Sequence, residues 1–317
     1  MIAIVVIALA AGAASALMFA SIVSGALISL LLFNLTPLPL MVAALGWGPI
    51  AATVGGIAAA TGLGAIFGLS SCITFALAFA LPAWWLGHLA LLGRPVATAS
   101  APGSDAPELE WYPVGRILLW IVAIAAMMTI ASMLTLGFDG PTITGAIRSA
   151  LVGILEPTGI AASDGRIDAL VAIMPPMATI GATMTLTLNL WLAAKIAATS
   201  GRLHRPWPDL KNTVLPPMTL AALSVALAFC FAGGLLAIVA QIVTTGLMMA
   251  YALTGFAVMH TLTLALKYRA LWLSCTYAVV MAVVWPILAM VALGVADAVF
   301  GIRQRYLSGR PPPLPVS

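Results

Sequence analysis

The chain has 317 residues, of which 63% are hydrophobic and only 7% are charged. Soluble domains carry about 25% charged residues, so this composition excludes an ordinary soluble protein and predicts a membrane protein in a lipid bilayer. The net charge of +4 is small and confined to a few segments. It therefore excludes a nucleic-acid-binding protein, and it suits loops that lie beside anionic lipid.

The first 93 residues contain no Asp, Glu, Lys or Arg. A transmembrane helix needs about 20 apolar residues, so this block has room for about four crossings. Gly and Pro, which commonly mark helix ends, divide it into the expected helices 3–33, 36–47, 49–69 and 71–92.

The remaining chain alternates between charged and apolar segments. Segment 94–113 is rich in Pro, Ala, Gly and Ser, which predicts a surface loop, and a span is expected at 114–136. In the external segment 137–166, apolar residues recur every three or four positions from Pro141 to Glu156, which predicts an amphipathic helix along the membrane surface. Later spans are expected at about 167–198, 215–231, 233–266 and 270–295, within a region that ends at residue 302, followed by a basic, Pro-rich tail at 303–317.

The run 233–266 leaves the number of spans open, because it fits one tilted helix or two short helices hinged near Gly255. Two helices there and four in the opening block place both termini in the cytoplasm, with nine basic residues inside and four outside. One helix there and three at the start give eight against five, with both termini outside. The positive-inside rule favours the first arrangement. We therefore predict an all-α, polytopic bundle of about 8–10 spans, ten in the preferred arrangement, forming a single membrane domain over residues 1–302.

Small residues form two stripes at four-residue spacing, a pattern that marks close contacts between helices in lipid. The second stripe lies within 49–69. Packing within the same chain is the simpler interpretation, and a docking face for a second membrane protein is the alternative. The candidate docking residues are in the first helix: Ala8, Gly12, Ala16 and Ala20.

Polar side chains inside spans are costly, so they are candidates for function. Asn189, Gln241 and His260 are the three we single out as ligand-binding candidates. They would line one polar cavity if they converge. If each side chain instead forms its hydrogen bonds with a neighbouring helix, a transport function has no ligand-binding site among these three residues.

Motifs for catalysis are missing from the sequence. It contains no phosphate-binding loop, no H-E-x-x-H, no C-x-x-C and no acid inside a confidently assigned span. Its three cysteines are scattered and have no metal-binding spacing. We therefore expect no enzyme activity, no cofactor and no bound metal.

The C-terminal part of the chain contains the segment Gly255 to His260 and the basic pair Lys267 and Arg269, and it ends in the pattern G-x-x-D-x-x-F-x-x-R. The pattern is formed by Gly294, Asp297, Phe300 and Arg303, and Arg305 follows it. The central span contains Asn189-Leu190-Trp191, followed by Lys195. In these motifs the chain resembles the YybS-like family of bacterial polytopic membrane proteins. Because the family has no assigned activity, the resemblance implies a multi-pass protein of the bacterial inner membrane rather than a reaction.

The opening block is also similar to the substrate-binding S components of energy-coupling-factor transporters. In those proteins a small-residue face of the first helix docks the coupling subunit, which here implies docking by Ala8, Gly12 and Ala16. Our leading hypothesis is a membrane component that binds or translocates a small molecule, with a second membrane protein or energising module as partner. The alternative is a structural or assembly protein that acts through helix–helix contacts.

Overall fold

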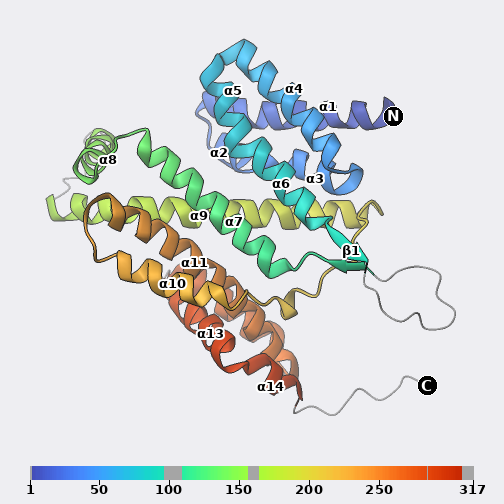
Figure 1. The fold of residues 1–317 in the computed structure, drawn as a ribbon, viewed down its shortest axis with the longest axis vertical. Helices are drawn as coiled ribbons and strands as arrows, with labels where there is room; N and C mark the ends of the chain where they lie inside the picture. Colours follow the sequence, from blue (N-terminus) through green and yellow to red (C-terminus); the bar gives the residue numbers. More distant parts are fainter. Residues whose placement is uncertain (1, 96–108, 156–163, 284, 309–317) are drawn as a thin grey trace. The chain divides into compact units, whose positions relative to one another are not determined.

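The computed structural model describes residues 2–95, 109–155, 164–283 and 285–308. Almost all of them are helical (Figure 1), which confirms the predicted all-α class. Seven helical segments are long and apolar enough to cross a membrane within this described part of the chain. They are Ile2–Ser24, Leu27–Trp47, Pro49–Phe67, Leu69–Ala90, Val114–Leu134, Gly165–Thr199 and Gly234–Leu262.

The number of such segments reaches eight if α13 (Ile287–Phe300) and α14 (Ile302–Ser308), which are bent by 66°, form one broken span. Eight is the lower end of the predicted range, and ten is not reached. The reason is length, because α10 (Met218–Phe229) and α12 (Arg269–Ala282) have 12 and 14 residues. At 1.5 Å per residue they measure about 18 and 21 Å, less than the roughly 30 Å core of a bilayer.

The opening block contains four candidate spans, as predicted, but the boundary between the first two was wrong. The helix α1 (Ile2–Ala20) and the 3₁₀ turn η1 (Ser21–Ser24) end at Gly25, whose φ of +66° is left-handed. The second span combines α2 (Leu27–Asn34) and α3 (Pro37–Trp47). The third is α4 (Pro49–Phe67), and the fourth joins α5 (Leu69–Phe75), the π-helical turn η2 (Ala76–Ala80) and α6 (Leu81–Ala90).

The later spans also differ from the prediction. The helix α9 (Asp164–Thr199) runs through Pro175 and Pro176, and α11 (Gly234–Leu262) is one helix with no hinge at Gly255. The single span predicted at 270–295 is wrong, because α12 ends at Ala282 and α13 starts after Pro286. A proline has no N–H with which to continue a helix.

The segment predicted as a loop at 94–113 carries a short antiparallel hairpin. Its strands are β1 (Gly93–Pro95) and β2 (Leu109–Trp111), with Arg94 opposite Glu110. The helix α7 (Val114–Leu134) follows, and it is long and apolar enough to be the span predicted there. The predicted tail at 303–317 is also corrected, because its first six residues belong to α14, while 309–317 lie outside the described residues.

The predicted amphipathic helix is present as α8 (Gly140–Leu155). Its N-terminus is capped by Asp139, whose carboxylate accepts hydrogen bonds from the Thr142 N–H (2.9 Å) and hydroxyl (2.8 Å). These bonds hold the pKa of Asp139 below its ordinary value, so the cap stays charged at neutral pH. On its apolar side, Ile143 and Ile147 contact Ile167 and Val171 of α9. This face therefore packs against the chain itself.

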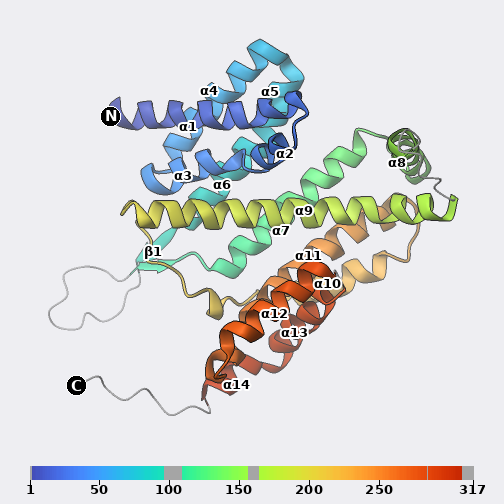
Figure 2. The same ribbon diagram turned by 180° about the vertical axis from the view of Figure 1, so that it is seen from behind.

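The described chain divides into two compact units. Unit 1 comprises residues 1–124 and 181–208, and unit 2 comprises 125–180 and 209–317. The core of unit 1 joins α1 to α6 with parts of α7 and α9, and includes the ring cluster of Phe19, Phe33, Phe75 and Phe79. In unit 2, α12 and α13 lie beside α11, with α14 at their end (Figure 2).

Candidate functional site

The second candidate span of unit 1 is interrupted between α2 and α3. Pro37 has no N–H, so the Phe33 carbonyl loses its usual donor and accepts from the Thr36 N–H instead (3.2 Å). The Leu38 N–H bonds to the Leu35 carbonyl (3.0 Å). The Asn34 carbonyl, which would normally accept from Leu38, is therefore left without a donor from its own span.

Side chains of other helices satisfy the backbone at this break. Asn189 of α9 donates from Nδ2 to the Asn34 carbonyl (2.9 Å) and to the Thr185 carbonyl (2.7 Å). The Thr185 hydroxyl donates to Asn34 Oδ1 (3.1 Å), and the Ser15 hydroxyl of α1 donates to the Thr36 carbonyl (2.7 Å). The interruption is thus held by Ser15 of α1 and by Thr185 and Asn189 of α9, three residues that belong to unit 1.

Two oxygens at this break have no hydrogen-bond partner among the described residues. They are Oδ1 of Asn189, a side chain 1% exposed, and Oγ1 of Thr36, which is fully buried. An unsatisfied buried polar group costs about 1–3 kcal/mol, and buried polar groups usually have a partner. Each of these oxygens could accept a hydrogen bond that the described residues do not supply.

The other two predicted ligand-binding residues, Gln241 and His260, lie in unit 2 on the continuous helix α11. Nineteen residues separate them, which is about 28 Å along a helix, so they cannot line one small cavity. His260 contacts the Tyr277 hydroxyl through Nε2 (2.8 Å). Gln241 is half-buried. Of the three candidates, Asn189 is the one that lies at the break between α2 and α3.

The small-residue stripe proposed as a docking face packs within unit 1. Ala8 is fully buried, and Gly12 lies so close to α4 that a Cβ there would overlap the Gly55 carbonyl oxygen. Ala16 and Ala20 contact the main core of unit 1. The first half of the predicted docking face, Ala8 and Gly12, is therefore covered by the chain's own helices, whereas Ala16 and Ala20 are half-buried.

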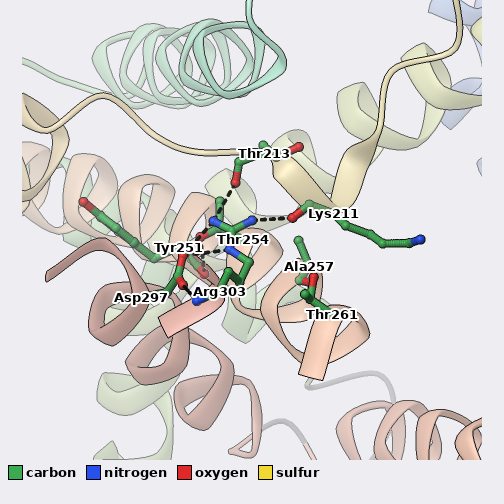
Figure 3. A network of polar contacts seen from close by, with 8 residues as sticks. All are labelled: Lys211, Thr213, Tyr251, Thr254, Ala257, Thr261, Asp297 and Arg303. Carbon is green, nitrogen blue, oxygen red and sulfur yellow. Dashed lines mark hydrogen bonds and ion pairs between the residues drawn. The ribbon is translucent and has the colours of Figure 1, made fainter. Parts of the chain in front are cut away.

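A second buried polar cluster lies in unit 2, where Asp297 of α13 and Arg303 of α14 form an ion pair (Figure 3). Asp297 Oδ2 accepts from Arg303 Nε and Oδ1 accepts from the Arg303 N–H, both at 2.8 Å. The guanidinium also donates to the carbonyls of Lys211 and Thr213. The two charged side chains are 8% and 6% exposed. This network ties the bend between α13 and α14 to the segment that leads into α10.

The other residues of the family-like ending lie outside the Asp297–Arg303 ion pair. Gly294 lies against α11, where a Cβ would overlap the Tyr251 carbonyl oxygen, whereas Phe300 and Arg305 are exposed. In the sequence, Asp297 and Arg303 were singled out only because they belong to the family-like ending. Their pairing could not be read from the sequence, because it depends on the αL turn at Gly301.

No family model, no curated protein and no solved structure matches this chain. Function therefore has to be argued from the two polar clusters and the surfaces of the units. Within the described ranges, no three His, Cys, Asp or Glu side chains are grouped so that they could hold a metal ion.

Proposed function

We propose that the chain is a multi-pass membrane protein whose unit 1 binds a small polar molecule at the break between α2 and α3. The observation that supports this proposal is the pair of buried oxygens without a hydrogen-bond partner in the described chain, Asn189 Oδ1 and Thr36 Oγ1. Lipid does not tolerate irregular backbone unless protein buries it or it lines a cavity. Membrane transporters commonly place their binding sites at such discontinuous helices.

The chemistry of the break favours a neutral ligand. Asn189 Oδ1 only accepts hydrogen bonds, and the Thr36 hydroxyl both donates and accepts. The groups that hold the break are Ser15, Asn34 and Thr185, none of which is ionisable. A small solute with N–H or O–H donors fits this set, and the set offers no general acid or base. The proposed role is thus binding or translocation, with any energy input supplied by a separate partner.

The first prediction concerns Thr36→Val, which removes the unpartnered hydroxyl and nearly preserves the shape. We expect ligand-free protein in mild detergent to unfold with a free energy raised by about 1–3 kcal/mol, because a buried unsatisfied group is removed. We also expect the affinity for the bound molecule to fall roughly fivefold, because one hydrogen bond worth about 1 kcal/mol is lost. Native mass spectrometry of the purified protein measures that retention.

The matched control is Thr219→Val in unit 2, another buried threonine whose hydroxyl has no partner among the described residues. It should raise the free energy of unfolding by a similar amount and leave the retention of the bound molecule unchanged. If Thr36→Val only stabilises the protein, and no small molecule accompanies the unmodified chain, the break is a structural feature and the proposal fails.

A further inference from the structure

A cluster of hydrogen-bond donors lies at the C-terminal end of α11 in unit 2. Arg269 Nη2 approaches His260 Nδ1 at 3.5 Å, and His260 Nε2 lies 2.8 Å from the Tyr277 hydroxyl. A guanidinium can only donate, so Nδ1 is the acceptor and the neutral ring carries its proton on Nε2. His260 then donates to the Tyr277 oxygen, which leaves the Tyr277 O–H free to donate elsewhere.

The positive charge of Arg269 is not balanced by an ion pair with a described carboxylate. Its Nε–H is also buried without a hydrogen-bond partner in the described chain.

The wider composition adds to this excess of positive charge. Residues 209–317 contain six basic residues and two acids, and Asp297 is already paired with Arg303. Arg269 is also the first residue of α12, the end of a helix at which the dipole disfavours a cation. An anion bound beside Arg269 and Tyr277 would balance the charge and accept hydrogen bonds from the free Arg269 Nε–H and Tyr277 O–H.

The surroundings of Arg269 select the kind of anion. Exposed apolar and aromatic side chains flank it in sequence, namely Leu266, Tyr268, Leu271 and Trp272, which are 44%, 63%, 62% and 59% exposed. A freely soluble anion gains nothing from these side chains, whereas a lipid places its phosphate on the cations and its acyl chains along the apolar surface. Basic pockets between transmembrane helices bind anionic headgroups in this way.

We infer that Arg269, His260 and Tyr277 form a binding site for the phosphate headgroup of an anionic phospholipid. The inference rests on the membrane location given under the proposed function, but not on the small-molecule site in unit 1. Thr36→Val should therefore leave lipid binding unchanged, so that failure of one proposal does not imply failure of the other.

The test is native mass spectrometry of the full chain in detergent, titrated with phosphatidylglycerol or phosphatidylcholine. The unmodified protein should retain phosphatidylglycerol at least about tenfold more strongly, and Arg269→Gln should remove most of that preference, because a charge-assisted hydrogen bond is lost. Arg305→Gln, which removes an exposed cation of α14, should change retention less than about twofold.

Tyr277→Phe guards against a fold defect, since it keeps the ring stacked on Phe256 (centroids 5.2 Å apart) and removes only the hydroxyl. We expect it to weaken phosphatidylglycerol retention about fivefold, while the loss of the His260 bond lowers the unfolding free energy of the lipid-free protein by only about 1 kcal/mol. Equal retention of both lipids, or equal losses in the Arg269 and Arg305 variants, would overturn the inference. So would displacement of the lipid by millimolar inorganic phosphate, which would identify a free phosphate as the ligand.

Discussion

Asp297→Asn is expected to lower the free energy of unfolding by about 3–5 kcal/mol, because it leaves the Arg303 guanidinium buried without its counter-ion. Asparagine keeps one oxygen, which can still accept from the Arg303 N–H at the first turn of α14. The loss therefore comes from the contact of Asp297 Oδ2 with the guanidinium, which an amide N–H cannot replace. Equilibrium unfolding in mild detergent, followed by circular dichroism, measures the change.

The matched control is the exposed ion pair between Arg94 and Glu110, whose side chains are 79% and 51% exposed. Glu110→Gln should cost less than about 1 kcal/mol, since exposed pairs contribute little. Similar effects for the two substitutions would show that the Asp297–Arg303 pair is not buried from solvent as described.

Gly255→Ala and Gly294→Ala are each expected to cost about 3 kcal/mol or more and to separate α11 from α13. A Cβ at Gly255 would overlap the Met290 carbonyl oxygen, and one at Gly294 would overlap the Tyr251 carbonyl oxygen. Backbone atoms cannot move aside as a flexible side chain can, so the helices have to part. Thermal unfolding of the purified variants checks the loss.

Gly145→Ala on α8 is the control, because a Cβ there meets nothing within 4 Å. Alanine favours a helix over glycine by about 1 kcal/mol, so this variant should be neutral or slightly more stable. If all three glycine variants were tolerated equally, the close contact of α11 and α13 would be wrong.

The sequence predicted the all-α class and the four segments of the opening block, because apolar length and missing charge decide both. It could not predict the first boundary. Asn34 and Pro37 look like a stronger break than Gly25, yet α1 and α9 supply the hydrogen bonds that let the second span continue past them. Such support comes from residues distant in sequence.

The same limit applies to the candidate site. Asn189 was singled out as a polar residue inside a span, and it does lie at the break. Thr36 was not singled out, because a threonine beside prolines looks like a helix end. Gly255 illustrates the reverse error: a glycine in a long apolar run fits a hinge as well as a contact, and only the position of Met290 shows that it is a contact.

The most direct test of the proposed function is a high-resolution map of the full chain in lipid nanodiscs, examined at the break between α2 and α3. We expect density for a non-protein molecule larger than water within hydrogen-bond distance of Asn189 Oδ1 or Thr36 Oγ1. Hydrogen bonds from both oxygens to protein groups or to single water molecules, with no such density, would contradict the proposal.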